Sequence, residues 1–232
     1  QGLDQQIVEK LKIKCSKAKL NDWKKVIRLE SEQKGETKIA MVGKYTELVD
    51  SYKSVNEALI HAGIHNKTNV KIEHIDSERF NKGVHNLEAD GILIPGGFGN
   101  RGIKGMLNVA RFARENNIPY LGICLGMQVA VIEFARNVLK LDADSTEFKK
   151  NTKHPVIGLI TEWLDEDGLV QYRSEDSDKG GTMRLGSQVC QLKKNSKMAK
   201  LYNKLKISER HRHRYEFNGN YESTFNKNGM AI

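Results

Sequence analysis

Cysteine and proline are scarce in this chain, and long hydrophobic runs are missing. Its 232 residues include three prolines and three cysteines, namely Cys15, Cys124 and Cys190. Three scattered cysteines exclude a disulfide framework, and the lack of a Cys-x-x-Cys pair argues against a zinc site. No apolar run approaches the roughly 20 residues that cross a bilayer. We therefore expect a protein of the reducing cytoplasm, with no membrane segment and no resident metal.

The first residues also lack the features of a secreted protein. Gln1-Gly2-Leu3-Asp4 has neither the basic nor the apolar region of a signal peptide. It has no initiator methionine either, which suggests a chain processed or cut from a longer one. The formal net charge of +9 is compatible with a nucleic-acid or phosphate ligand. Because many lysines stand singly in polar stretches, we favour a solvated basic surface and expect no nucleic-acid partner.

Short apolar runs alternate with amphipathic stretches through the middle of the chain. Strands are predicted at residues 38–43, 70–75, 91–95 and 120–123, and helices at 51–62, 104–116 and 128–139. This alternation is typical of an α/β fold with a doubly wound, mostly parallel sheet and flanking helices. In this interpretation residues 38–232 form one domain. Residues 1–37, with helical stretches at 7–15 and 22–29, would be the end of a preceding domain and a linker.

The pattern changes after Leu139. Further strands are predicted at residues 154–160 and 186–192, and a short helix at 196–206. The polar segment 165–181 between the two strands is expected to be a hairpin or a loop. No regular element is expected in residues 219–232, which are mostly polar.

A candidate nucleophile stands where a predicted strand ends. The run Tyr120-Leu-Gly-Ile stops at Cys124, with glycines two places before it and two places after it. With a helix expected to follow, this Gly-x-Cys-x-Gly pattern is typical of a nucleophile elbow, a sharp strand-to-helix turn. The glycines would relieve crowding in the turn, and the helix N-terminus would favour the thiolate. The alternative is a buried cysteine that only packs at the end of a core strand.

A glycine-rich turn follows another predicted strand, at residues 95–102, with the sequence Pro-Gly-Gly-Phe-Gly-Asn-Arg-Gly. It matches neither the dinucleotide-binding fingerprint nor the P-loop. Ligands of such sheets bind outside the carboxyl ends of the strands, so this turn and Cys124 can serve one site. The backbone N–H groups of Gly97 and Leu125 are then the candidate donors of an oxyanion hole. A phosphate-binding turn, or a merely tight one, is the alternative.

These two turns, together with other blocks in the same order, resemble the class I glutamine amidotransferase family. More narrowly, the chain resembles the glutaminase domains of the CTP synthases, and its first four residues resemble the end of their synthetase domain. The blocks that carry the resemblance are Met41–Tyr45, Ser51–Val55, Asn116–Gln128, Asp144–Phe148, Gly180–Gly186 and Glu209–Glu216.

The resemblance implies a glutamine-hydrolysing domain of a ligase. Cys124 would attack the side-chain amide of L-glutamine, form a glutamyl thioester and release ammonia. A synthetase domain, absent here, would use that ammonia to aminate UTP to CTP in pyrimidine nucleotide biosynthesis, with ATP and magnesium. GTP would act as an allosteric activator, and the full protein would be a homotetramer. No cofactor is implied for the glutaminase domain itself.

The resemblance also assigns roles around the nucleophile. Glu147 would bind the α-amino group of the substrate, and Arg214 would hold its α-carboxylate, which suits a guanidinium. The glutamine pocket would be lined by Gly97, Leu125, Gly126, Met127 and Gln128. The GTP site or its lid would include Phe98, Arg184 and Leu185.

Without the resemblance, two of these assignments have simpler explanations. Glu147 alone is better explained as a solvated or capping carboxylate beside a helix. The arginines of the segment 210–214 alternate with His211 and His213. That alternation fits a charged strand face or a phosphate patch equally well.

The catalytic base expected for such a site is missing from the sequence. The family completes its site with a His-Pro-Glu motif, because a thiol nucleophile needs a base that a carboxylate orients. None of the seven histidines precedes Pro-Glu, and His154, which precedes Pro155-Val156, is interpreted as structural. We therefore expect weak or no glutamine turnover by these residues alone. The alternatives are another class I amidotransferase, a basic nucleotide- or nucleic-acid-binding domain, and a non-catalytic regulatory domain.

Overall fold

The computed structural model describes residues 2–16, 18–159, 162–164, 170–172 and 183–232. The chain forms two compact units. One contains Gln1–Thr37 and Ser54–Lys71, and the other contains Lys38–Lys53 and Ile72–Ile232. The domain boundary expected after residue 37 stays a prediction. Residues 54–71, which were expected in the second domain, belong to the same compact unit as residues 1–37.

The smaller unit contains two of the helices expected from the sequence. They are α1 (Leu3–Lys10) and α2 (Asn21–Ser31), and most of α3 (Lys53–Asn66) belongs to the same unit. Neither α1 nor α2 buries a side chain. Gln33 Nε2 donates a hydrogen bond to the carbonyl of Thr68 at 2.9 Å, and the hydroxyls of Thr37 and Thr68 are 3.1 Å apart. These contacts join residues 33–37 to the segment that follows α3.

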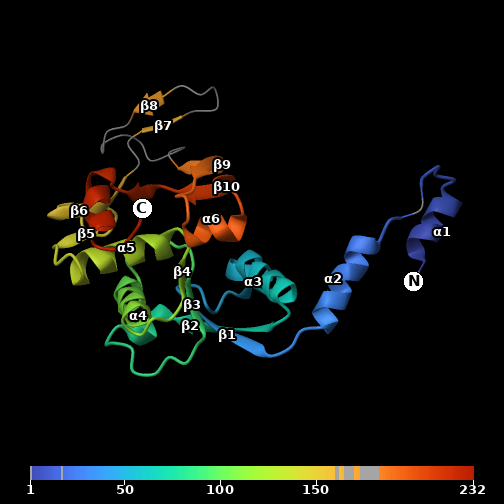
Figure 1. Cartoon of the computed structure of the whole chain (residues 1–232), viewed down its shortest axis with the longest axis horizontal. Coiled ribbons are helices and arrows are strands. Elements are labelled where there is room, and N and C mark those ends of the chain that lie inside the picture. Colours follow the sequence, from blue (N-terminus) through green and yellow to red (C-terminus); the bar gives the residue numbers. More distant parts are fainter. Residues whose placement is uncertain (1, 17, 160–161, 165–169, 173–182) are drawn as a thin grey trace. The chain divides into compact units, whose positions relative to one another are not determined.

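The larger unit is built on a four-stranded sheet in the order β2-β1-β3-β4 (Figure 1). The strands are β1 (Glu36–Gly43), β2 (Asn69–Asp76), β3 (Gly91–Ile94) and β4 (Tyr120–Gly122). β3 pairs in parallel with both β1 and β4, so that Ile92 lies opposite Ala40 and Tyr120. The parallel pairs confirm the predicted α/β fold, and the central strand β3 is buried and apolar along its whole length, as is typical of a parallel sheet.

Two helices flank this sheet, α4 (Ile103–Glu115) and α5 (Leu125–Asn137). The short 3-10 helices η1 (Val49–Tyr52) and η2 (Ser77–Phe80) lie in the connections. The apolar face predicted for α4 is buried. The core between these elements includes Ala40, Val42, Ile92, Ile94, Met106, Val109, Ala110, Ala113, Leu125 and Val129.

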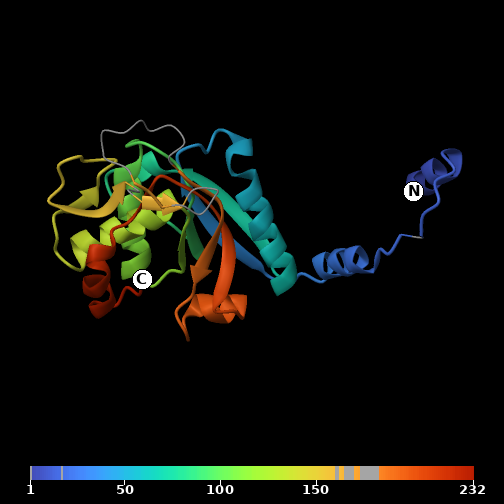
Figure 2. The same cartoon turned by 90° about the horizontal axis from the view of Figure 1, so that it is seen from above.

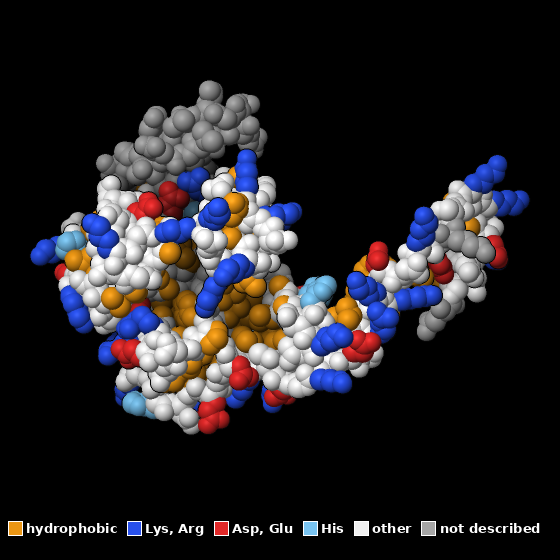
Figure 3. Space-filling view, in the orientation of Figure 1, with side chains coloured by type: hydrophobic (Ala, Val, Ile, Leu, Met, Phe, Trp, Pro, Cys, Tyr) orange, Lys and Arg blue, Asp and Glu red, His pale blue; other side chains and the backbone are white. Residues whose placement is uncertain are grey.

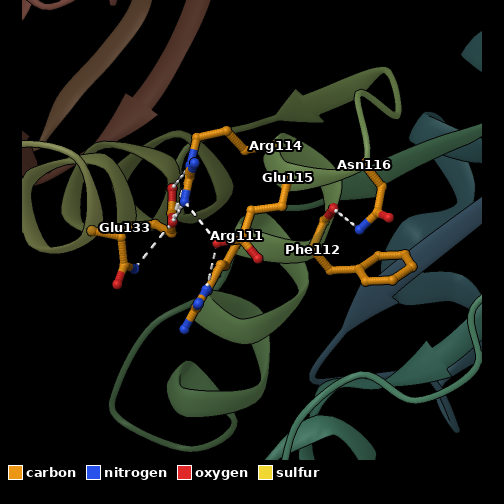
Figure 4. Close-up of polar contacts among 7 residues, drawn as sticks. Arg111, Phe112, Arg114, Glu115, Asn116 and Glu133 are labelled. Atoms are coloured by element: carbon orange, nitrogen blue, oxygen red, sulfur yellow. Dashed lines mark hydrogen bonds and ion pairs between the residues drawn. The ribbon is translucent and has the colours of Figure 1, made fainter.

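A buried ion pair joins α4 to α5 (Figure 4). The Glu133 side chain is 3 % exposed, and Arg114 grips its carboxylate through Nε and a terminal nitrogen, at 3.0 and 2.8 Å. Asn137 donates a further hydrogen bond to it at 3.1 Å. The carboxylate therefore has the partners that a buried charge requires, and the helix that follows Cys124 is fixed against its neighbour.

A second sheet, in the order β11-β6-β5, follows α5 in the chain. Its strands are β5 (Ala143–Ser145), β6 (His154–Leu159) and β11 (Tyr215–Phe217). β6 was expected from the sequence, whereas β5 was not. The apolar core beside this sheet contains Val131, Ile132, Ala135, Ala143, Val156, Ile157 and Phe225.

The prediction that residues 219–232 form no regular element is wrong. They contain the 3-10 helix η3 (Gly219–Tyr221) and the helix α7 (Glu222–Lys227). Phe225 is fully buried and packs against Phe134 of α5, with ring centroids 5.6 Å apart. α7 lies beside α5 in both views (Figures 1 and 2). One aromatic anchor thus orders a segment whose composition is otherwise polar.

An antiparallel hairpin, β9 (Arg184–Gln191) and β10 (Lys206–His213), forms a separate two-stranded sheet. The helix α6 (Lys197–Tyr202) lies in its connection, and Ser196 caps it by accepting the N–H of Ala199 at 3.1 Å. A second antiparallel pair consists of β7 (Glu162–Leu164) and β8 (Val170–Tyr172). Most of the expected hairpin or loop at 165–181 lies outside the described residues.

The described part of the chain contains no helix long and apolar enough to cross a membrane. It also contains no group of three or more His, Cys, Asp or Glu side chains arranged to hold a metal ion.

Candidate active site

Cys124 lies on a sharp turn between β4 and α5. Its backbone has φ 53° and ψ −105°, a left-handed conformation that is costly for a residue with a Cβ. The neighbouring glycines are required by space, because a Cβ on Gly122 would overlap the backbone of Gly126. A Cβ on Gly126 would overlap the carbonyl of Ile94 in β3. The structure therefore shows the elbow that the Gly-x-Cys-x-Gly pattern predicts.

The helix after the elbow begins three residues earlier than expected. α5 starts at Leu125 and not at Gln128. The sequence pattern misplaced the start because Leu125 and Gly126 are buried on the strand side and carry no capping signal. Because α5 begins at Leu125, the positive end of its helix dipole lies directly beside the thiol of Cys124, where it favours the thiolate.

Two backbone N–H groups face the thiol, from Leu125 and from Gly97. Burial raises the pKa of the Cys124 thiol, and the nearby Glu147 carboxylate acts in the same direction, while hydrogen bonds from these two N–H groups oppose the shift. Gly97 belongs to the turn after β3, so the two glycine-rich turns do meet at one edge of the sheet. Gly97 and Leu125 stay predictions as oxyanion donors, but they lie where that role requires.

The thiol opens into a cavity of about 830 Å³. Its walls come from the ends of β3 and β4, the start of α5 and the strand β10. Figure 3 shows apolar side chains gathered in a hollow below the β9–β10 hairpin. The residues that line the cavity are Tyr45, Ser51, Tyr52, Gly96, Gly97, Phe98, Gly122, Ile123, Cys124, Met127, Gln128, Tyr202, Glu209, Arg210, His211, Arg212, His213 and Tyr215.

Among the candidate pocket residues, Gly97, Met127 and Gln128 line this cavity. Gln128 is 3 % exposed, and its Nε2 donates to the carbonyl of Tyr215 at 3.1 Å. Leu125 and Gly126 lie behind the lining, where they offer backbone and not side chain. Of the residues expected to line the glutamine pocket, some therefore line the cavity and the others lie behind that lining.

Glu147 lies beside the glycine-rich turn and not in the cavity lining. Its Oε1 accepts the backbone N–H of Gly99 at 2.9 Å, and its own N–H donates to Ser145 Oγ at 3.1 Å. The interaction with the Cys124 thiol noted above places this carboxylate near the nucleophile. The role of Glu147 stays a prediction, and its bond to the Gly99 N–H shows that its carboxylate binds the backbone of the glycine-rich turn.

Arg214, like Glu147, is a candidate that the structure does not bring to the cavity lining. It follows β10, and its Nε is buried without a hydrogen-bond partner among the described residues. Of the effector candidates, Arg184 and Leu185 are adjacent in β9, and Phe98 belongs to the glycine-rich turn. Phe98 lines the cavity and is 47 % exposed, Leu185 is 59 % exposed on β9, and Arg184 pairs with Glu216 at 3.1 Å.

Sequence reasoning missed Lys44 and the role of the two histidines of β10. Lys44 follows β1 directly, its side chain is buried, and burial lowers its pKa to about 8. The Met-Val-Gly-Lys-Tyr block contained the signal, since a lysine after a buried strand must find partners. His211 and His213 line the cavity together with Arg210 and Arg212, whereas the sequence pattern drew attention to the arginines alone.

No histidine bonds the nucleophile within the described residues. The thiol of Cys124 donates a long hydrogen bond, at 3.7 Å, to the carbonyl of Arg212. His154, interpreted as structural, is hydrogen-bonded to the hydroxyl of Tyr221 at 3.3 Å and is not in the cavity lining. The described part of the chain thus brings the candidate nucleophile Cys124, two backbone N–H groups and a cavity together, and places no imidazole beside the thiol.

Comparisons with known proteins agree on one family. A family model described as glutamine amidotransferase class-I matches residues 47–231. Among solved structures, the glutaminase domain of CTP synthase from Trypanosoma brucei, with bound acivicin, is similar to this chain. The two are 40% identical in sequence with a TM-score of 0.69, over 83% of this chain and 72% of that chain.

Proposed function

Because the chain belongs to the class I glutamine amidotransferases, and within them to the glutaminase domains of CTP synthases, we propose that Cys124 hydrolyses the side-chain amide of L-glutamine. The observation that carries the proposal is the position of the half-buried thiol. It lies at the floor of a large cavity and faces two backbone N–H groups. This is the arrangement that acyl transfer from an amide requires.

The chemistry follows from that geometry in two steps. The sulfur attacks the amide carbon, and the N–H groups of Gly97 and Leu125 stabilise the oxygen that becomes negative. The C–N bond then breaks, the amide nitrogen takes a proton and leaves as ammonia, and a glutamyl thioester remains on Cys124. Water attacks this thioester, which releases glutamate and restores the thiol.

Substrate recognition would use the charged groups at the edge of the pocket. Glu147 is the proposed partner of the α-ammonium group, since its carboxylate lies beside the glycine-rich turn. Arg214 is the proposed partner of the α-carboxylate. Its buried and unpartnered Nε supports this role, although the guanidinium must turn toward the cavity to fill it.

The wider role is proposed from the relatives. The released ammonia would pass to a synthetase domain that aminates UTP with ATP and magnesium, in a homotetrameric ligase of pyrimidine nucleotide biosynthesis. GTP would activate the reaction through Phe98, Arg184 and Leu185. The cytoplasm is the proposed location of this pathway step.

A labelling experiment tests the glutaminase proposal without requiring turnover. The chain is incubated with a chloromethyl-ketone analogue of glutamine, and the adduct is mapped by peptide mass. We expect a single adduct on Cys124 that excess glutamine prevents, and no adduct in Cys124→Ala. Cys190→Ala is the matched control and should label like the wild type. Equal labelling of Cys15, Cys124 and Cys190, or labelling that glutamine does not reduce, would contradict the proposal.

A further inference from the structure

Lys44 joins the end of β1 to the glycine-rich turn that carries Gly97. Its Nζ donates hydrogen bonds to two successive carbonyls of that turn, those of Phe98, at 3.0 Å, and Gly99. The side chain is 3 % exposed, and its carbon stem lies 3.5 Å from where a Cβ of Gly97 would stand. The lysine stem therefore lies in ordinary packing distance of position 97.

The turn also reaches back to Lys44. Arg101 donates a hydrogen bond from its guanidinium to the backbone carbonyl of Lys44, and pairs with Glu78 at 3.2 Å and Asp76 at 3.5 Å. Lys44 thus donates to carbonyls of the turn, and Arg101, which follows the turn in the chain, donates to the carbonyl of Lys44. Two such reciprocal bonds restrict the turn in a way that one bond cannot.

Glu147 completes the same arrangement from a third segment. Its carboxylate accepts the N–H of Gly99, while Lys44 bonds the carbonyl of that residue. Burial lowers the pKa of Lys44 to about 8, and Glu147 opposes the shift. The groups that attach to the turn are therefore charged and close together, and Lys44 among them is withdrawn from water.

We propose that Lys44 and Arg101 are positioning residues, which hold the turn of residues 96–99 so that the Gly97 N–H stays directed at the Cys124 thiol. This inference rests on the proposed glutaminase function, because only a reaction with a developing oxyanion needs that N–H. Neither side chain touches the reacting atoms. Their effect is to keep one oxyanion donor in place before substrate binds, which is where preorganised donors gain their value.

The test compares two electrophiles on the same thiol. The chloromethyl-ketone analogue of glutamine carries a carbonyl that uses the oxyanion donors, whereas iodoacetamide alkylates a thiol without them. For Lys44→Met we expect the ratio of the two Cys124 rates to fall by about 10- to 100-fold, less than the roughly 10²- to 10³-fold lost when one oxyanion donor is removed, because the donor is displaced and not deleted. Iodoacetamide alone should react at close to the wild-type rate. Lys104→Met, which removes an exposed lysine from α4, is the matched control and should leave the ratio unchanged.

A second variant covers the case in which Lys44→Met does not fold. Arg101 is about half exposed, so Arg101→Met should fold and lower the same ratio by a smaller factor, about threefold. Urea unfolding of each variant separates a loss of fold from a loss of positioning. Wild-type ratios in both variants would overturn the inference and leave the glutaminase function standing. If the wild-type chain itself shows no preference for the glutamine analogue, the proposed function fails and the inference with it.

Discussion

Cys124 and Cys190 are both half-buried thiols, yet their surroundings differ in kind. Cys124 lies on a strained turn and faces backbone N–H groups. Cys190 lies in the regular strand β9, opposite Ile207, and its sulfur is 3.4 Å from Nε2 of His211. The first thiol has what stabilises a developing oxyanion, and the second has an imidazole that can accept its proton.

The hairpin imidazoles form a directed chain of hydrogen bonds. His213 Nδ1 donates to the carbonyl of Tyr215 at 3.2 Å, since a carbonyl can only accept. His213 Nε2 must then accept from His211 Nδ1, at 3.0 Å, which leaves His211 Nε2 to accept the proton of the Cys190 thiol. The comparison teaches that a basic partner alone does not make a nucleophilic site. At the elbow the groups that face the thiol are backbone N–H groups, whereas in the hairpin the group that faces the thiol is an imidazole side chain.

The largest expected effect is a difference in stability between two glycine-to-alanine variants, one at the elbow and one in the hairpin. Gly126→Ala places a Cβ on the carbonyl of Ile94 and should lower the free energy of unfolding by about 3 kcal/mol. Gly186→Ala in β9 meets no atom within 4 Å and suffers only from its φ of 86°, so about 1 kcal/mol is expected. Urea unfolding measures both. A Gly126→Ala variant that gains about 1 kcal/mol, as helix propensity alone predicts, would refute the crowded elbow.

A somewhat smaller difference in stability is expected between variants that break one ion pair in each of the two regions. Arg114→Met leaves the buried Glu133 of α5 without its main partner, and we expect a loss of about 3 kcal/mol or slightly less. Arg184→Met breaks the partly exposed pair with Glu216 beside the hairpin and should cost under about 1 kcal/mol. The same urea measurement applies. Equal losses in the two variants would show that burial does not distinguish the pairs.

The smallest effect is an opposite pH dependence of stability in the two regions. Burial lowers the pKa of His213 from its ordinary 6.5, so its contribution is present above that pH and is lost as the pH falls. Burial raises the pKa of Cys124 above its ordinary 9.0, so its contribution is lost as the pH rises beyond that value.

Single variants isolate these two contributions. His213→Gln should flatten the acid side of the stability curve, and Cys124→Ala the alkaline side, each measured as a difference from the wild type by urea unfolding. The comparison with the wild type is needed because Lys44, whose pKa is lowered to about 8, makes stability rise with pH on the alkaline side, whereas Cys124 makes it fall. An unchanged acid limb in His213→Gln, or an unchanged alkaline limb in Cys124→Ala, would contradict the assignment.

Much of the central sheet could be predicted from the sequence. β1, β3 and α4 lie within two residues of the expected bounds, because their apolar patterns are strong and local. α7 was missed, since its burial depends on the contact of Phe225 with Phe134, which is remote in the sequence. The start of α5 was misplaced for a similar reason, because its first residues are buried by β3 and lack a local capping signal.

Residues close together in the chain were enough to predict the two glycine-rich turns and the candidate nucleophile Cys124, and the order of several short blocks was enough to indicate the family. The groups that support these features come from remote segments, which only the folded chain brings together. Lys44 meets the turn of residues 96–99, and Arg101 meets the carbonyl of Lys44, through the parallel pairing of β1 with β3. His211 and His213 reach the cavity through the placement of β10. Burial and distance between remote segments set these contacts, and no local pattern encodes either quantity.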